Sequence, residues 1–339
     1  MADENPPPRP TLRALAKLAG LSATAVSMAL RNNPRIPAVT RARVQRLAKK
    51  QGYRPDPEVV KLMLHLRRRR VVRAQATLCG LTNWPAGSPS PYIDPLVRSA
   101  RLRAKEQGYN FDVIQLEPYA GSSGALERVL RSRGVQGVLL LTLTSPASLA
   151  GLLDWSRFSV VATSYSVLNP VCHRVLPHHF ENAMLAFRTL IARGYKRIGL
   201  VLSEGTDLRT NHCYTAAIAW HQKFGLCERV KPLIRVTDSV QALRQWLAEE
   251  KPDVVAGEWS GGLLQTVRAI GKKVPAELAV VSLSSTANQE LAHIDERPAA
   301  IGATAVDIVA AMVLRSEQGL PAAPQVTMVE GRWVDGATV

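Results

Sequence analysis

Residues 11–53 have the sequence TLRALAKLAGLSATAVSMALRNNPRIPAVTRARVQRLAKKQGY, which predicts three short helices. Apolar residues recur at helical spacing over 12–19, and Thr11 can accept a hydrogen bond from an unpaired amide of that helix. Gly20 is free to adopt a positive φ, and Ser22 can cap the next helix. These residues therefore predict a helix, a tight turn and a second helix in immediate succession.

The second helix, predicted over 23–30, carries small side chains on the side that faces away from its domain. Ala25, Val26, Ala29 and Leu30 are expected to point into the core. The outward set is Ala23, Thr24, Ser27, Met28 and Arg31. A helix with such small outward residues fits into the major groove of a DNA duplex, so this helix is the predicted DNA reader.

A third helix is predicted to start at Thr40, where its Val44, Leu47 and Ala48 complete the core. The opposite face carries Arg41, Arg43, Arg46, Lys49 and Lys50. A row of charges on one helix commonly does no more than keep that face solvated. Beside a helix-turn-helix pattern, however, it favours contact with DNA phosphates.

The positive charge of the chain is concentrated at its beginning. The net charge is +16, and residues 1–73 hold 17 Lys and Arg against 4 Asp and Glu, which leaves +3 for residues 74–339. A basic head on a nearly neutral body is typical of a nucleic-acid binder, because neutralising phosphates releases counterions. A membrane surface would attract the same head, but no apolar run near 18 residues and no lipidation signal supports that partner.

Residues 11–55 resemble the N-terminus of the LacI family of transcriptional regulators. The matching elements are T-L-x-x-L-A-x-x-A-G-L-S-x-x-x-V-S-x-A-L, then T-R-x-x-V, then G-Y-R-P. The predicted DNA-binding residues that this resemblance implies are Ala23, Thr24 and Met28 at bases, Ser22, Ser27 and Arg41 at phosphates, Arg31 and Arg35 at the groove edge, and Thr11 and Arg54 beside them. The family often has Arg where this chain has Met28, so the bidentate guanine contact is missing and a different operator is expected.

A hinge helix and basic linker are predicted over 56–73. The Asp-Pro-Glu sequence at 56–58 is a strong helix start, and the turns after it have an apolar face that needs a partner. That helix either packs on its own domain or pairs with its copy from a second chain in the DNA minor groove. The resemblance implies the second arrangement, with Leu62 inserted at the central base step. The arginines of 67–73 either reach flanking phosphates or form a solvated junction.

From residue 74 onward, strand patterns alternate with helical patterns, which predicts parallel sheets with helices on both faces. The predicted fold class is α/β, with a helix-turn-helix domain at 9–55, the hinge, and two Rossmann-like doubly wound halves over 74–339. This body resembles the periplasmic-binding-protein-like sensor of the LacI family. The resemblance implies one half formed by 74–163 and 286–319, another formed by 164–285 and 320–339, and dimer contacts on the helix beginning near Asp94.

Two of the predicted helices of the body span 145–156 and 209–224. On the second of these, Trp220 is expected to belong to the core together with Ala217 and Phe224, because the three share one helical face.

Ligands of such folds bind beyond the carboxyl ends of the strands, between the two halves. The loop residues that can line this cleft are Trp84, Tyr92, Tyr119, Arg209, Asn211, Glu258, Trp259 and Ser284. The family usually grips its effector with an Arg, an Asn-Asp pair and an Asp-Asp pair, where this chain has Thr210, Trp259-Ser260 and Ser284-Ser285. Either the effector is not an ordinary sugar, or the pocket has lost its ligand.

No pattern for catalysis is present: the chain has no G-x-S-x-G, no P-loop and no G-x-G-x-x-G. His173, His178 and His179 lack a carboxylate at metal-ligand spacing and are interpreted as exposed loop histidines. The four cysteines form no C-x-x-C pair, which predicts reduced thiols in the cytoplasm, where a nucleoid-associated protein would lie. Neither an enzyme activity nor a cofactor is expected.

The leading hypothesis is a homodimeric repressor on a palindromic double-stranded DNA operator, modulated by a small-molecule effector. The alternative within this class is an effector-independent regulator with a degenerate pocket. A cytosolic small-molecule binding protein whose basic head is a secondary anchor is the rival class, and neither a secretory leader nor a catalytic triad favours it.

Replacing Leu62 by Ala should weaken operator binding, because the apolar wedge that holds the central base step open would be lost. Titration of a labelled operator with the wild type and the variant measures the effect. Unchanged affinity would remove the wedge role from Leu62.

Overall fold

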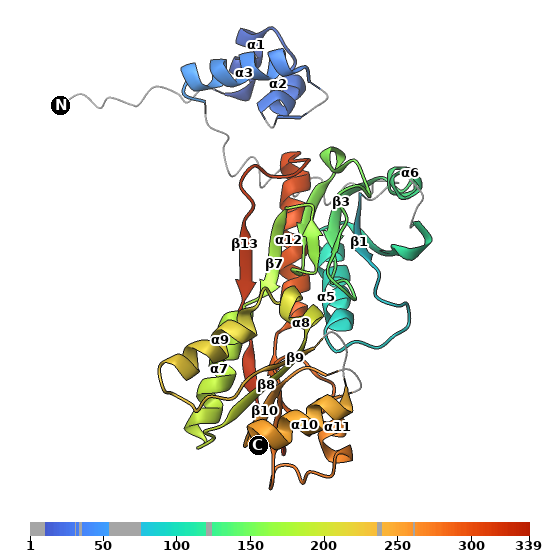
Figure 1. Cartoon of the computed structure of the whole chain (residues 1–339). Helices are drawn as coiled ribbons and strands as arrows, with labels where there is room; N and C mark the ends of the chain where they lie inside the picture. The colour runs from blue at the N-terminus through green and yellow to red at the C-terminus, as the bar shows by residue number, and fades with distance from the viewer. Residues whose placement is uncertain are drawn as a thin grey trace, which may run out of the picture.

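The computed structural model describes residues 11–30, 32–33, 36–53, 76–119, 124–235, 239–259 and 262–339 (Figure 1). These ranges contain a three-helix N-terminal domain and two parallel sheets with helices packed on both faces. The predicted hinge helix and the arginines of 67–73 lie outside the described residues.

The N-terminal domain consists of α1 (Leu12–Ala19), α2 (Ala23–Leu30) and α3 (Ala38–Lys50). The predicted caps and turn are confirmed: Thr11 Oγ1 accepts from the Ala14 amide at 3.2 Å, Ser22 Oγ accepts from the Ala25 amide at 3.1 Å, and Gly20 has a φ of 65°. The core consists of Leu15, Ala16, Ala19, Val26, Ala29, Val44 and Ala48. The predicted start of the third helix at Thr40 was wrong, because the extended Pro37 ends the preceding loop and Ala38 is already helical.

The first sheet has the strand order β13-β7-β5-β3-β1-β2, and all its pairs are parallel. Its strands are β1 (Thr77–Thr82), β2 (Asn110–Gln115), β3 (Val135–Leu140), β5 (Ser159–Ala162), β7 (His173–Pro177) and β13 (Val326–Val329). The helices of this half are α5 (Ile93–Glu106), α6 (Ala125–Ser132) and α12 (Pro298–Arg315). Successive residues of β1 face opposite cores, since Leu78 packs with α5 and α12 while Cys79 packs with α6.

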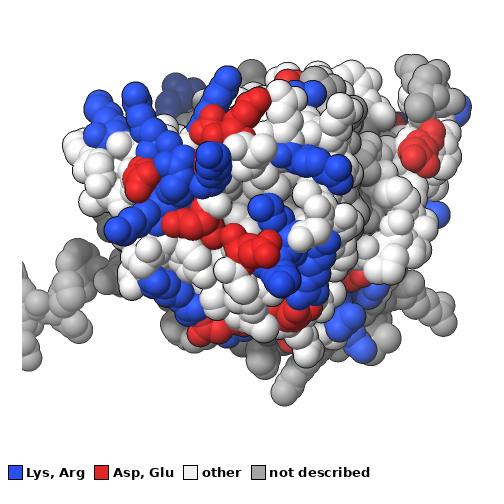
Figure 2. Space-filling view, turned by 60° about the horizontal axis from the view of Figure 1, so that its bottom comes forward, with Lys and Arg blue, Asp and Glu red and all other residues white. Residues whose placement is uncertain are grey.

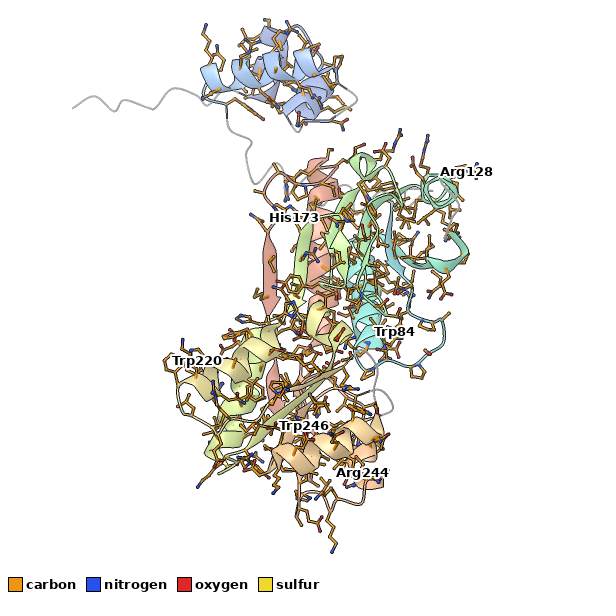
Figure 3. All side chains as sticks on the ribbon, in the orientation of Figure 1. Trp84, Arg128, His173, Trp220, Arg244 and Trp246 are labelled. Atoms are coloured by element: carbon orange, nitrogen blue, oxygen red, sulfur yellow. The ribbon has the colours of Figure 1, made fainter. Side chains whose placement is uncertain are left out.

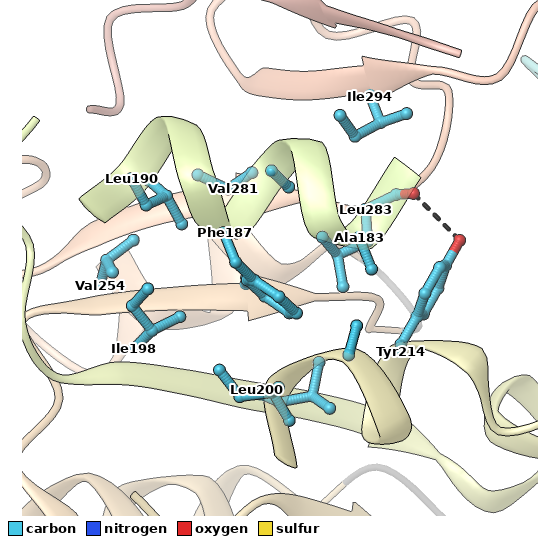
Figure 4. Packing of buried hydrophobic residues seen from close by; sticks show 14 of the residues in the cluster. Ala183, Phe187, Leu190, Ile198, Leu200, Tyr214, Val254, Val281, Leu283 and Ile294 are labelled. Atoms are coloured by element: carbon cyan, nitrogen blue, oxygen red, sulfur yellow. Dashed lines mark hydrogen bonds between the residues drawn. The ribbon is translucent and has the colours of Figure 1, made fainter. Parts of the chain in front are cut away.

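The second sheet has the order β14-β12-β11-β10-β8-β9, parallel except for β14. Its strands are β8 (Ile198–Ser203), β9 (Leu233–Arg235), β10 (Val254–Gly257), β11 (Ala279–Ser282), β12 (Ala292–Asp295) and β14 (Arg332–Val334). One core lies against α7 (His179–Ala192) and α9 (Cys213–Lys223), as Figure 4 shows, and the other against α10 (Val240–Glu250) and α11 (Leu263–Ala269). The short helix α8 (Glu204–Arg209) follows β8 directly.

The predicted membership of the two halves was wrong at three strands. β7 belongs to the first sheet although 164–285 was assigned to the second half, and β12 belongs to the second sheet although 286–319 was assigned to the first. β13 returns to the first sheet, where Thr327 pairs with Val175. Strand patterns in the sequence identify strands but not their partners, and these pairings join distant residues.

Two predicted helices also differ from the structure. The segment 145–156 forms the short strand β4 (Ala147–Ser148), which pairs with β6 (Val167–Asn169), and it ends in the 3-10 turn Trp155–Arg157. The segment 209–224 is broken between α8 and α9, because Asn211 and His212 adopt left-handed backbone angles, with φ of 54° and 59°.

Trp220 and Phe224 were expected in the core, but they are 41% and 60% exposed. Trp220 lies on the outer side of α9 (Figure 3), and Phe224 directly follows that helix. Their rings contact each other with centroids 5.0 Å apart. Ala217, on the same helix, is buried as predicted.

The surface of the second half carries charges of both signs. Figure 2 shows Lys and Arg interspersed with Asp and Glu on the end of the molecule that α10 and α11 form, and the ion pair between Arg268 and Glu290 is one example. This mixed surface agrees with the near-neutral body that the sequence predicts.

The expectation that the chain has no apolar run near 18 residues was wrong, because the 18 residues of α12 are long and apolar enough to cross a membrane by length and composition alone. Its inner face is nevertheless in the core of the first half, where Ile301, Ala305 and Val309 are fully buried. Gly302 brings its backbone so close to α5 that an added Cβ would collide with the carbonyl oxygen of Leu96. The helix is therefore a core element whose position depends on the missing side chain of Gly302.

Replacing Gly302 by Ala should lower the free energy of unfolding by about 1–3 kcal/mol, because the new methyl group pushes α12 away from α5. This loss opposes the usual gain from replacing a helical Gly by Ala. Urea unfolding followed by circular dichroism measures it. Gly151→Ala is the matched control, since a Cβ there meets open space; equal midpoints for both variants would contradict the packing argument.

Candidate functional site

The predicted DNA-reading helix is α2, and the residues of its outward face are exposed to different degrees. Thr24 is exposed, while Ser27 and Met28 are half-buried. Ala23 was predicted to face outward, but it packs partly against the core of its domain. The predicted contacts Arg31, Arg35, Arg54 and Leu62 lie outside the described residues.

Two arginines of α3 are held by carbonyl groups at the ends of the other helices. Arg41 donates from Nη1 to the Asn32 carbonyl at 2.8 Å, just beyond α2, and Arg43 donates from Nη2 to the Ala19 carbonyl at 3.0 Å. A guanidinium has five N–H groups, so one such bond orients Arg41 without using up its donors. Arg41 is therefore oriented at the end of the predicted reading helix.

A second cluster of polar groups lies at the carboxyl end of the second sheet. Arg209 at the end of α8 forms an ion pair with Glu258, which follows β10. Thr206 Oγ1 donates to the same carboxylate at 3.4 Å. Because carboxyl ends of parallel strands meet at one sheet edge, the loops after β11 and β12 reach this cluster too, with Ser285 and Glu296.

Glu296 is the most deeply buried carboxyl of this cluster, only 3% exposed. Its Oε2 accepts from the Ser285 amide at 3.3 Å, and its own amide donates to Ser285 Oγ at 2.9 Å. Oε1 lies 3.5 Å from Nδ1 of His179. Burial, and then the charge of Glu258, raises the pKa of Glu296 to about 8.

His179 and Tyr214 form the wall beside Glu296. His179 is 9% exposed, and burial followed by the charge of Arg209 lowers its pKa to about 3, so its ring is neutral. Tyr214 is fully buried and donates to the Leu283 carbonyl at 3.0 Å (Figure 4). The two rings meet edge to face with centroids 5.7 Å apart.

The first half contributes Tyr92, which lies at the start of α5. Burial, and then the charge of Glu296, raises the pKa of the Tyr92 phenol well above its usual range. The phenol of the first half is therefore within electrostatic range of the buried carboxyl of the second half.

The predicted ligand residues fall into three groups. Arg209 and Glu258 lie in the Glu296 cluster, Tyr92 packs on the core of the first half within electrostatic range of it, and Ser284 lies in the adjoining loop, where its amide donates to Ser282 Oγ. Trp84 lies beside α5 (Figure 3), at a separate depression of about 470 Å³ that the 85–89 loop and α5 also line. The others are apart: Tyr119 and Trp259 pack on the cores of their own halves, and the Asn211 side chain is exposed.

Sequence reasoning missed Glu296 and misjudged His179, which is buried and not an exposed loop residue. Glu296 had a signal, since an acidic residue directly after an apolar strand and two residues before a helix-starting Pro occupies a strand end. The sequence has no comparable signal for the burial of His179, because this burial depends on the packing of α9 against α7.

Two family models match this chain. Residues 11–56 match the bacterial regulatory proteins of the lacI family, and residues 187–339 match the periplasmic binding protein-like domain. The first match covers the three-helix domain and the second covers most of the second half. The chain therefore combines a lacI-family N-terminal domain with a periplasmic-binding-protein-like domain.

Curated relatives of this chain include proteins named HTH-type transcriptional repressor PurR. The one from Pectobacterium atrosepticum is 24% identical over 193 residues, which cover 56% of this chain and 53% of that relative. The chain thus spans about half the length of that relative. The one from Pasteurella multocida is 22% identical over 316 residues, covering 88% of this chain and 90% of the relative.

Solved structures share the fold over nearly the whole length. The transcriptional regulator CelR in complex with cellobiose is 20% identical with a TM-score of 0.62, covering 98% of this chain and 100% of that one. The lac repressor dimer bound to operator and the anti-inducer ONPF is 17% identical with a TM-score of 0.57, covering 97% and 98%.

The pH dependence of stability should reveal the buried Glu296 carboxyl. A group whose pKa is raised from 4.5 to about 8 holds its proton more tightly in the folded state, so its contribution to stability falls as the pH rises through that interval. His179, lowered from 6.5 to about 3, acts oppositely but only below its ordinary value of 6.5. Between pH 6.5 and pH 8, therefore, Glu296 is the only one of these two groups that changes the stability with pH.

From pH 6.5 to 8, the stability of the wild type relative to Glu296→Gln should therefore fall by about 1–2 kcal/mol. Urea titrations at each pH measure the difference. Glu249→Gln, at an exposed carboxylate of α10, is the control and should show a constant difference from the wild type. A constant difference for Glu296→Gln as well would contradict the raised pKa.

Proposed function

We propose that this chain is a homodimeric repressor that binds a palindromic operator. We propose further that a small molecule bound in the Glu296 cluster changes its affinity for that operator. The observation that carries the proposal is the helix-turn-helix: Ser22 caps α2, Thr24 is exposed on it, and Arg41 is oriented at its end. Such a helix enters the major groove with phosphate contacts on either side. This role places the protein in the cytoplasm, and it contains no catalytic step.

The chain crosses between the two halves three times: after β7, after β12 and after β13. The first crossing is linked to each of the other two. Asn182 of α7 accepts from the Gly331 amide at 2.8 Å beyond β13, and His179 of α7 lies against Glu296 beyond β12. A ligand beside Glu296 would touch this linked set of crossings. If it binds better to one arrangement of the halves, it shifts the population towards that arrangement and changes the spacing of the two DNA-reading domains.

The dimer contact is proposed for the free side of α5. One side of this helix packs on α12, but Leu102 is exposed on another, and Val97, Arg98 and Arg101 line the depression beside Trp84. An isologous pair of α5 helices would bury this surface and give the two-fold symmetry that a palindromic site requires.

One observation favours the effector-independent alternative. The guanidinium of Arg209 is already engaged by Glu258 within the chain, so it is not waiting for an anionic ligand. A regulator of that kind would bind its operator equally well with and without small molecules.

Selection of bound DNA from random duplexes tests the proposed function. The wild type should return a palindrome whose half-sites match the spacing of a dimer, with a flexible step at its centre. Met28→Arg should change the selected base at one position of each half-site towards guanine, because Arg can bond guanine O6 and N7 together.

Arg41→Ala serves as the control for this selection. It should lower affinity for all sequences alike and flatten the dependence of log K on log salt by about one unit, as the loss of a phosphate contact does. Recovery of no consensus sequence by the wild type would overturn the proposed function.

A further inference from the structure

Arg98 and Arg101 of α5 are two positive charges without a partner. Both are exposed, and neither forms an ion pair with any of the described residues. Arg103, on the same helix, is instead held by Asp307, to which its Nε donates at 2.6 Å. Asp94 lies one turn before Arg98, at a spacing that commonly gives an ion pair, but its Oδ2 accepts from the Ser90 amide at 3.0 Å. The chain itself therefore leaves these two charges unbalanced.

The two arginines line the depression of about 470 Å³ beside Trp84. Ile93 and Val97 of α5 and Val113 of β2 make much of the remaining wall apolar. With Asp94 counted, the lining still carries one net positive charge. The volume is within the range of about 300–1,000 Å³ that small-molecule sites have. An arginine on a flat surface needs no partner, but two of them around one apolar hollow suit an anion that also has an apolar part.

Trp84 adds an independent observation that points to a ligand. Its indole Nε1 is buried and has no hydrogen-bond acceptor among the described residues, although its amide donates to Thr82 Oγ1 at 3.0 Å. A buried indole N–H usually has an acceptor, so this one needs an explanation. A ligand with several acceptor oxygens that enters beside the 85–89 loop can supply the missing acceptor.

We propose that this depression binds a small organic phosphate, whose phosphate group pairs with Arg98 and Arg101. The apolar part of the ligand then lies against Trp84 and Val97. Residues three apart on a helix are neighbours, so both guanidinium groups can reach one phosphate. The two guanidinium groups and the Trp84 indole are three donor groups, and a phosphate ester offers three terminal oxygens where a carboxylate offers two.

This site is separate from the Glu296 cluster, because all of its lining residues belong to the first half. Binding here therefore does not depend on how the two halves of the body are arranged. The ligand recognised at this depression is a different molecule from an effector between the halves.

The phosphate site also bears on the proposed dimer. Arg98 and Arg101 flank the middle of α5 (Ile93–Glu106), so an isologous pair of these helices that cross at their middles brings four guanidinium groups together. Like charges across an interface oppose association. A phosphate in each depression balances them, and its binding therefore favours the dimer. This consequence rests on the proposed function, whereas the site itself does not.

Calorimetric titration of the full-length protein tests the site with three probes that share one ring: benzyl phosphate, phenylacetate and benzyl alcohol. The titrations use one ionic strength and about pH 7.5, where a phosphate monoester is mainly a dianion. Benzyl phosphate should bind saturably and about ten-fold or more tighter than benzyl alcohol, the size of effect expected from one charge-assisted contact. Phenylacetate should lie between them.

Replacing both arginines, as Arg98→Gln with Arg101→Gln, should remove this preference for benzyl phosphate. Arg128→Gln is the matched control, because Arg128 is an exposed arginine of α6 that has no ion pair among the described residues and does not line the depression (Figure 3). It should keep the preference. Equal urea midpoints show that the variants are folded.

Three outcomes would overturn the phosphate site. Benzyl phosphate could bind no tighter than benzyl alcohol, or not saturably at millimolar concentration. Phenylacetate could bind tighter than benzyl phosphate. The double variant could keep the affinity of the wild type, which would place the bound phosphate elsewhere, as on the basic N-terminal domain.

Sedimentation equilibrium tests the link with the dimer. Saturating benzyl phosphate should lower the dissociation constant of the wild-type dimer about five-fold or more. The double variant lacks the opposing charges, so it should dimerise more tightly than the wild type without ligand and should not respond to benzyl phosphate. Binding of benzyl phosphate to the wild type with an unchanged dissociation constant would refute the link.

The phosphate site and the proposed function fail separately. Selection of a palindromic operator by a protein that does not prefer benzyl phosphate would refute the phosphate site alone. Preference for benzyl phosphate without any selected operator would refute the DNA-binding function alone.

Discussion

Parallel strand pairing is the constraint on which the body of this protein depends. A parallel neighbour can only be reached by a crossover, and these crossovers place helices on both faces of each sheet. The same constraint puts every loop that leaves the second sheet at one edge, apart from the loop of the antiparallel β14. Arg209, Glu258, Ser285 and Glu296 come from the segments that follow four different strands and still form one polar cluster, because β8, β10, β11 and β12 all end at that edge.

The Glu296 cluster places charged and titratable side chains where apolar side chains could pack. Ion pairs removed from water return little net stability, and an apolar replacement of equal volume is often at least as stable. Arg209, Glu258, Glu296 and His179 therefore contribute little to the fold that simple packing could not supply. Their concentration beside the chain crossings is better explained by binding and by movement of the halves than by stability.

The helix-turn-helix domain could be predicted almost residue by residue, because its signals are local. Thr11, Gly20 and Ser22 act within a few residues of themselves, so the sequence contains all that decides their role. The membership of β7, β12 and β13 could not be predicted in the same way. None of these three strands was expected from the sequence, and the sheet that each joins is chosen by contacts with strands far along the chain. The burial of Glu296 and His179 depends on the same distant packing.

The candidate site was predicted only in part, because local patterns place residues at strand ends while their orientation depends on packing between distant segments. Arg209 and Glu258 could be placed at strand ends from the alternation of strands and helices, but Asn211 and Trp84 could not be excluded, since their orientation depends on the break after α8 and on the packing of α5. Predictions for Arg31, Arg35, Arg54 and Leu62 stay predictions. The aromatic pair Trp220 and Phe224 is the opposite case, because a regular helical pattern suggested a core that the neighbouring elements do not cover.

The break between α8 and α9 has a mechanical consequence. Asp207 of α8 accepts from Thr215 Oγ1 of α9 at 2.6 Å and lies 2.7 Å from Nδ1 of His212, so the short helix is fastened to the long one on the far side of the turn. Arg209, at the end of α8, is two residues from Asp207. A displacement of α9 would therefore pull on Asp207 and, through α8, on Arg209, so the outer surface of the second half is connected to the buried ion pair by these two side-chain contacts.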